Sequence, residues 1–171
     1  MLRWMLISSI SINRLKGGIV KHWEKGDYHK YATFIRDTER RFELPRNLLA
    51  LVLYQASKYD PATIAGTGQH PLSAIGIAKL TAHDANHLWG EQTPDYADRH
   101  DPGTKRRDPL ASILGAARLL RAKRWKFGSW KMALLAYHTS DDIALSTAHK
   151  GVAMPIDAAE YIAQITAQVK A

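Results

Sequence analysis

Residues 44–61 read LPRNLLALVLYQASKYDP, and this stretch decides which fold the sequence predicts. Residues 48–54 (LLALVLY) within it are almost wholly apolar, so no polar face remains to point toward water. A helix that is apolar on nearly every face lies in the middle of a domain, with other elements packed around it. Pro45 suits the first turn of such a helix. We therefore expect a buried central helix that begins at Pro45 and ends near Ser57.

The rest of the chain reads as helices joined by loops, with hardly any strand-like alternation. Three residues of N-cap type mark predicted helix starts: Asp27, Thr81, and Asp108, which proline follows. Gly128 marks a predicted helix end. Pro155 opens the last predicted helix, for which we expect an inward face of Ile156, Ala159, Ile162 and Ile165. The predicted fold class is therefore mainly α.

The N-terminus differs in composition from the rest of the chain. Residues 1–12 read MLRWMLISSISI, an apolar run well short of the roughly 20 residues that a membrane-spanning helix needs. No small-x-small cleavage site comes after the run, so no clear cleavable signal peptide is visible. We predict an N-terminal arm or short helix over residues 1–26, which docks on its own domain or on a partner protein, and a single domain over residues 27–171.

Composition narrows the possible partners and cofactors. The 171 residues include 24 Lys and Arg against 16 Asp and Glu, which gives a formal net charge of +8, and there is no cysteine. The absence of cysteine excludes disulfides, cysteine-type zinc sites and a thiol nucleophile. His83 and His87 are four residues apart but lack an obvious third ligand, so we expect no metal and no cofactor. The positive charge favours an anionic partner. Because the basic residues spread over an outer helix face, we expect no nucleic acid.

Five motifs, in order along residues 28–165, resemble the catalytic domain of the soluble lytic transglycosylases, a lysozyme-like helical fold. Residues 44–61 resemble the first family motif. In that motif a buried helix ends in Glu-Ser, and an aromatic residue and then Asn or Asp before Pro come after it. The other family motifs are Gly-x-x-Gln-Leu-x-Pro, Phe-Gly-x-Trp, Ala-Leu-Ala-Ala-Tyr-Asn-Ala-Gly and a tyrosine in the last helix. Their counterparts here are residues 74–81 (AIGIAKLT), 127–130 (FGSW), 133–137 (ALLAY) and Tyr161.

The resemblance implies glycan strands of peptidoglycan as the substrate, cleaved with formation of a 1,6-anhydro product. It also implies one catalytic carboxylic acid, the Glu of Glu-Ser, and this chain has Ala56 at that position. A methyl group neither donates nor accepts a proton, and general acid–base catalysis contributes roughly 10²–10⁴-fold to a rate. We therefore expect catalysis to be absent or strongly impaired. The substrate-binding positions implied by the resemblance are Gln55, Ser57, Gly76, Ile77, Lys79, Tyr137, His138 and Tyr161.

Other side chains are poor replacements for the missing acid. Pro61 comes directly after Asp60, which indicates that the helix has ended there, and we interpret Asp141 and Asp142 as exposed, acidic carboxylates in a loop. His138 is a candidate because imidazole is a side-chain type used as a general acid or base. It also simply fills the family's Asn position with a polar residue. Lys79 in place of the family's Gln, and His138-Thr139-Ser140 in place of Asn-Ala-Gly, favour a domain that is naturally inactive.

Three hypotheses about function remain. The first is a glycan-binding, transglycosylase-like component of a phage virion that helps to penetrate the cell wall. The second is an active transglycosylase in which the catalytic Glu has been replaced by Ala56. The third is a structural virion or assembly subunit that binds no glycan and uses residues 1–26 to assemble. The expected location is the phage virion, as a tail or ejected protein, or the bacterial periplasm and cell wall.

Overall fold

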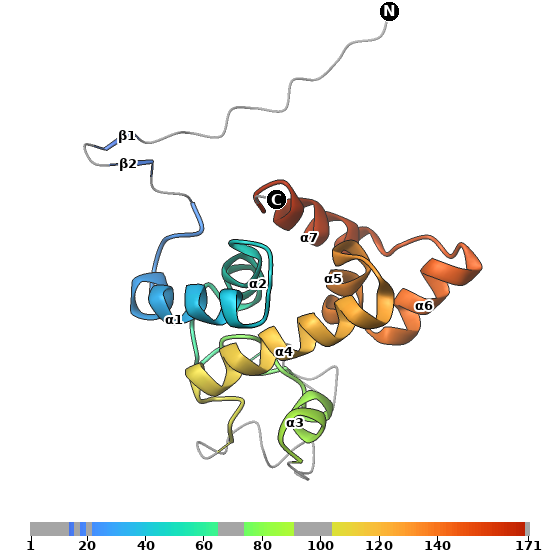
Figure 1. The fold of residues 1–171 in the computed structure, drawn as a ribbon, viewed down its shortest axis with the longest axis horizontal. Helices are drawn as coiled ribbons and strands as arrows, with labels where there is room; N and C mark the ends of the chain where they lie inside the picture. The colour runs from blue at the N-terminus through green and yellow to red at the C-terminus, as the bar shows by residue number, and fades with distance from the viewer. Residues whose placement is uncertain (1–13, 16–17, 20–21, 65–73, 91–103, 170–171) are drawn as a thin grey trace, which may run out of the picture.

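The computed structural model describes residues 14–15, 18–19, 22–64, 74–90 and 104–169, so residues 1–13 of the expected arm over residues 1–26 lie outside the described residues. The described part is mainly helical, as the sequence predicts (Figure 1). Its helices are α1 (Tyr28–Arg41), α2 (Leu48–Ser57), α3 (Ala82–Trp89), α4 (Pro109–Phe127), α5 (Trp130–His138), α6 (Asp141–Lys150) and α7 (Ile156–Thr166). Two short antiparallel strands, β1 (Arg14–Leu15) and β2 (Gly18–Ile19), precede them.

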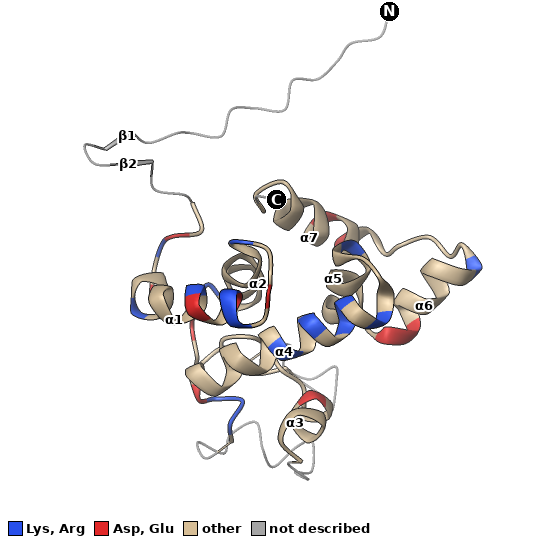
Figure 2. Cartoon of the chain, viewed as in Figure 1, with Lys and Arg blue, Asp and Glu red and all other residues tan. Residues whose placement is uncertain are grey.

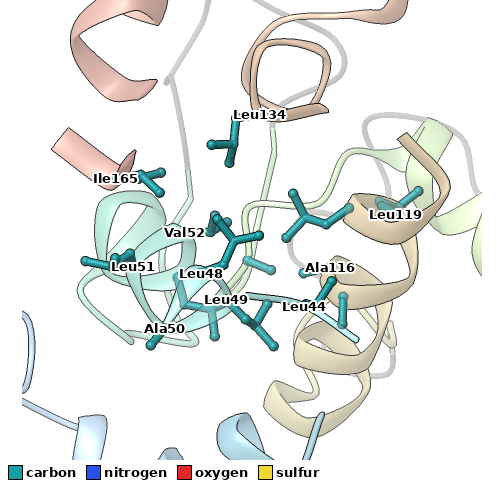
Figure 3. Close-up of a cluster of buried hydrophobic side chains, with 14 of the residues drawn as sticks. Leu44, Leu48, Leu49, Ala50, Leu51, Val52, Ala116, Leu119, Leu134 and Ile165 are labelled. Atoms are coloured by element: carbon teal, nitrogen blue, oxygen red, sulfur yellow. The ribbon is translucent and has the colours of Figure 1, made fainter. Parts of the chain in front are cut away.

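Helix α2 is the centre of the hydrophobic core. It packs against α1, α4 and α7, and its residues 49 and 51–53 have no exposed surface. Figure 3 shows its side chains surrounded by Leu119 of α4, Leu134 of α5 and Ile165 of α7, all of which are buried. The prediction of a buried central helix is confirmed.

The predicted start of this helix at Pro45 is wrong. Pro45 lies in a turn, where its carbonyl oxygen accepts a hydrogen bond from Leu48 N. Asn47, in the same turn, has a left-handed backbone with φ of 72°. The helix begins after that turn because the buried carboxylate of Glu39, from α1, accepts hydrogen bonds from its first N–H groups. The donors are Asn47 N at 3.1 Å, Leu49 N at 2.9 Å and Ala50 N at 3.2 Å. A side chain distant in sequence therefore supplies the cap.

A tight turn between Ile75 and Leu80 connects the core to α3. The backbones of these two residues pair with each other, and Ile75 also pairs with Ile64. Gly76 is required in the turn: its φ is +79°, and a Cβ atom there would lie 1.9 Å from the carbonyl oxygen of Arg106. Helix α3 then starts at the predicted N-cap Thr81, through a reciprocal capping box with Asp84.

Helix α4 also begins as predicted, since the side chain of Asp108 accepts hydrogen bonds from the backbone N–H groups of residues 110 and 111.

The inward face predicted for α7 is partly wrong. Ile162 and Ile165 are buried together with Ala158, whereas Ile156 is 79% exposed and Ala159 is also exposed. Ile156 lies two residues before Ala158, about 200° around the helix, and so points away from the core.

One further segment differs from the sequence interpretation. Asp141 and Asp142 are in the first turn of a helix, α6, rather than in a loop, because Ser140 caps this helix by accepting a hydrogen bond from Ile143 N.

Trp23 lies before α1, within the predicted arm of residues 1–26. It is 1% exposed and contacts Tyr28 edge to face, with 5.4 Å between the ring centroids. The predicted division into an arm and a domain stays a prediction. None of the helices described is long and apolar enough to cross a membrane.

The cap on α2 gives a stability prediction. Substituting Glu39→Gln replaces one acceptor oxygen with an NH₂ group that faces backbone donors, and it removes the negative charge at the helix N-terminus. We expect the free energy of unfolding to fall by about 2 kcal/mol, as measured by urea denaturation.

The matched control is Glu43→Gln. Glu43 lies four residues further along, is 73% exposed and pairs with Arg121 at the surface, so its substitution should leave the free energy of unfolding nearly unchanged. Equal losses in the two variants would contradict the role assigned to Glu39.

Candidate functional site

A cavity of about 880 Å³ opens beside the C-terminal end of α2. Its walls come from segments far apart in the sequence: the last turns of α2, the segment between residues 74 and 81, α3, and the C-terminal half of α4. The end of α5, the start of α6 and Tyr161 of α7 complete it. A concave site built from several helices is a common form of ligand-binding site.

Most of the residues singled out from the sequence meet at this cavity. The lining includes Ala56 and its neighbour Gln55 from α2, together with Lys79, Tyr137, His138 and Tyr161. These side chains come from four separate segments, and the fold brings them together. Their roles toward a substrate remain predictions.

Ser57, Gly76 and Ile77 lie behind the cavity wall instead, and all three are buried. The Ser57 hydroxyl donates a hydrogen bond to the Ile77 carbonyl oxygen at 2.7 Å and lies 3.3 Å from the carbonyl oxygen of Leu53. This bond holds the turn of residues 76–79 against the end of α2. The structure therefore gives Ser57 and Gly76 structural contacts, and their predicted contact with substrate stays a prediction.

Two tyrosines and a histidine form the aromatic part of the wall. The Tyr137 hydroxyl donates to the carbonyl oxygen of Ala78 at 2.9 Å. Burial raises the pKa of Tyr137 well above its ordinary value, and the charges of Tyr161 and Asp84 raise it further. Burial likewise raises the pKa of Tyr161. Both hydroxyls therefore remain protonated at neutral pH. The His138 ring stacks on Tyr161, with 4.2 Å between the ring centroids and 16° between the planes.

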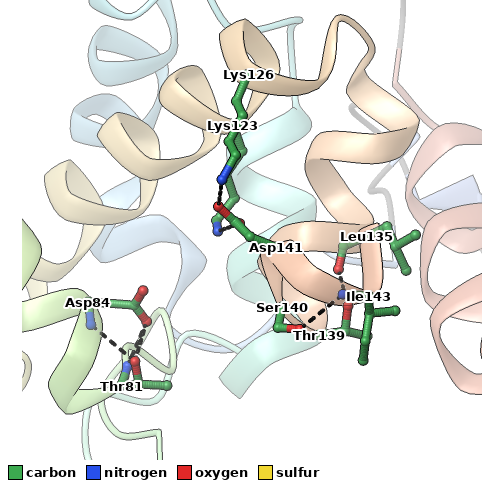
Figure 4. A network of polar contacts seen from close by, with 9 residues as sticks. All are labelled: Thr81, Asp84, Lys123, Lys126, Leu135, Thr139, Ser140, Asp141 and Ile143. Carbon is green, nitrogen blue, oxygen red and sulfur yellow. Dashed lines mark hydrogen bonds and ion pairs between the residues drawn. The ribbon is translucent and has the colours of Figure 1, made fainter. Parts of the chain in front are cut away.

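A network of charges closes another side of the cavity. Asp141 of α6 accepts hydrogen bonds from Lys123 Nζ at 2.6 Å and from Lys126 Nζ at 2.7 Å, both on α4 (Figure 4). Burial raises the pKa of Asp141, but the two lysines outweigh this effect and the pKa is lowered. The sequence alone did not single out these lysines. Their spacing of three residues lets them meet one carboxylate, but spacing does not reveal a partner on another helix.

Comparison with known proteins identifies the family. The sequence profile of the transglycosylase SLT domain matches residues 33–148. The chain belongs to the transglycosylase SLT family. This assignment and the helical architecture together confirm the lysozyme-like helical fold that the motifs imply. The family assignment also makes peptidoglycan the substrate class associated with the domain. A search of the curated proteins finds no match.

The carboxyl groups that line the SLT cavity in the described part of the chain are all engaged or exposed. Asp84 accepts hydrogen bonds from Thr81 N at 2.9 Å and Thr81 Oγ1 at 2.8 Å, and Asp142 is exposed. Asp141 has a lowered pKa and stays ionised, whereas a general acid needs a raised pKa. Asp60 lies outside the lining and accepts a hydrogen bond from Ala62 N.

The uncharged polar groups of the SLT cavity suit a hydroxyl-rich ligand. The lining offers an amide from Gln55, the ring and hydroxyl of Tyr161, and the imidazole of His138. His83 and His87 also line it, and no third metal-ligating side chain joins them among the residues that the structure describes. The arrangement can hold a sugar chain through hydrogen bonds and aromatic faces.

The Asp141 network predicts a pH-dependent stability. Because the folded-state pKa of Asp141 is lowered, its pairing with Lys123 and Lys126 stabilises the fold above the unfolded pKa, and the effect is lost as the pH falls through the folded pKa. Solvent screens this partly exposed pair, so Asp141→Asn should lower the free energy of unfolding by about 1 kcal/mol at neutral pH. Urea denaturation at neutral and acidic pH should show the difference shrinking toward zero in acid.

Asp142→Asn is the control, because Asp142 occupies the same first turn of α6 and has no ion pair in the described structure. Its substitution should change the unfolding free energy little at either pH. A loss in Asp141→Asn that persists undiminished in acid would exclude the ionic origin of the effect.

Proposed function

We propose that this SLT-family chain holds peptidoglycan glycan strands in its cavity and cleaves them slowly or not at all. The observation that carries the proposal is the place of Ala56. It lies on the cavity wall in the last turn of α2. The motif resemblance aligns this position with the catalytic glutamate of the family. A methyl group there leaves the scissile bond without a proton donor.

The surroundings of Ala56 support binding without cleavage. Gln55, Tyr161 and His138 give the cavity hydrogen-bonding groups and aromatic surface. Among the described residues, the lining carboxylates are poorly suited to replace the acid: Asp84 is hydrogen-bonded to Thr81, Asp142 is exposed, and the pKa of Asp141 is lowered. Lys79 adds a positive charge to the same wall.

We further propose that the chain acts as a phage virion component that helps to penetrate the cell wall, with residues 1–26 as an assembly arm. The apolar residues 1–12 and the small size of the domain support this role. In this role the domain would bring the particle into contact with the glycan, and binding alone would suffice for that contact.

Binding to purified sacculi tests the main proposal. The full chain should sediment with sacculi and release no anhydro-muropeptides. Gln55→Ala removes a lining amide and should weaken retention about fivefold, the loss expected for one hydrogen-bonding group. Gln164→Ala, exposed on α7 and outside the lining, should bind as the unaltered chain does.

The same experiment can reject the proposal. Rapid release of anhydro-muropeptides by the purified chain would show that it is an active enzyme. Detection of the chain in purified phage particles, combined with no retention on sacculi, would instead support a structural subunit.

Restoring the acid separates a naturally inactive cavity from one in which glutamate has been replaced. A nearby ammonium lowers the pKa of a carboxyl group, and a general acid needs that pKa raised. With Lys79 on the wall, Ala56→Glu alone should cleave weakly, with its optimum shifted to acid. Combining it with Lys79→Gln should raise cleavage at neutral pH. Release of anhydro-muropeptides from sacculi, measured across pH, reports on both variants.

The alternative gives a different result. Full cleavage by Ala56→Glu at neutral pH, with no gain from Lys79→Gln, would mean that the cavity is intact and that only the glutamate is missing.

A further inference from the structure

Two lysines without acidic partners lie beside the end of α2. Lys58 is the C-cap of α2, two residues after Ala56, and Lys79 lines the cavity. Neither lysine pairs with an aspartate or glutamate anywhere in the described part of the chain. Both have left-handed backbones, with φ of 56° and 49°, a conformation that residues other than glycine seldom adopt.

The fold holds these two lysines near each other. The hydrogen bond from Ser57 to the Ile77 carbonyl oxygen fixes the end of α2 against the turn that carries Lys79. The Lys58 ammonium lies 3.9 Å from the centre of the Tyr54 ring, which limits where it can point. Burial lowers the pKa of Lys58, and the charge of Lys79 lowers it further.

Lys58 is not among the residues that line the cavity, whereas Lys123 and Lys126 line it together with Lys79 and are in a different state. Lys123 and Lys126 share the carboxylate of Asp141, so their charges are compensated within the protein (Figure 4). Figure 2 shows basic segments on α4 and an acidic segment on α6. The charges of Lys58 and Lys79 are not compensated in this way, and like charges held close together repel each other. A bound anion would remove this repulsion.

We propose that Lys58 and Lys79 form a subsite that binds a carboxylate of the glycan strand in the cavity. This inference rests on the proposed glycan binding. Peptidoglycan offers two kinds of carboxylate: the lactyl group of a muramoyl sugar that has lost its stem peptide, and the carboxylates of the stem peptide itself. A polymer of N-acetylglucosamine alone has neither, so the subsite would distinguish muramoyl strands from neutral chitin-like chains.

Calorimetry on the full chain tests this with three oligosaccharides of equal length. They are a peptide-free muramoyl oligomer, the same oligomer with stem peptides, and a chitooligosaccharide. At low salt, at least one muramoyl ligand should bind about fivefold more tightly than the chitooligosaccharide, as expected for a partly exposed ion pair. The muramoyl ligand that binds more tightly of the two identifies which carboxylate the subsite holds. High salt should remove the preference for muramoyl ligands over the chitooligosaccharide, and this measurement uses the unaltered chain.

Variants then locate the subsite. Lys58→Gln and Lys79→Gln should each lower the muramoyl preference, measured as the ratio of the affinity for the muramoyl ligand to that for the chitooligosaccharide, with circular dichroism confirming the fold. Lys131→Gln, exposed on α5 and outside the cavity lining, should keep the preference. Equal binding of all three ligands, or a preference that survives in both variants, would overturn the subsite and leave glycan binding intact. Absence of binding to any ligand would overturn the proposed function itself.

Discussion

The carboxylate of Glu39 at the N-terminus of α2 is the contact on which the rest of the structure depends. It is a buried, charged group, and three backbone N–H donors of α2 compensate for the loss of its hydration. Burial raises its pKa, and those donors partly offset the rise. The contact joins α1 to α2 and fixes where α2 starts. Because a helix is rigid, it also fixes where the other end of α2 places Ala56 and Lys58.

From that end, each neighbouring element is attached by a polar contact to a backbone carbonyl. Ser57 holds the turn through Ile77, and Tyr137 holds the next residue of the turn, Ala78. These hydroxyls lie beside the cavity, but their hydrogen bonds serve the architecture. An SLT domain can therefore lose its acid and keep the shape of its cavity, because the groups that maintain the shape differ from the group that would transfer the proton.

The charges around the cavity fit binding better than cleavage. A general acid in this family would need an apolar surrounding that keeps it protonated. The wall beside Ala56 instead contains Lys79, with Lys58 nearby, and these cations would keep a carboxyl group ionised. The same two cations suit an anionic ligand. The proposed absence of the acid and the positive charge beside Ala56 are therefore consistent with each other, and both fit the proposed binding of a charged glycan.

The sequence by itself determined the features that depend on local patterns. Residues 48–54 predicted the buried helix, Thr81 and Asp108 predicted two helix starts, and the ordered motifs indicated the family. Only the tertiary structure revealed Glu39 as the cap of α2 and Asp141 as the partner of two lysines. It also decided that Ile156 faces solvent. The physical reason is that propensity and periodicity act over neighbouring residues. Ion pairs, caps between helices and the choice of buried face depend on which segments pack together.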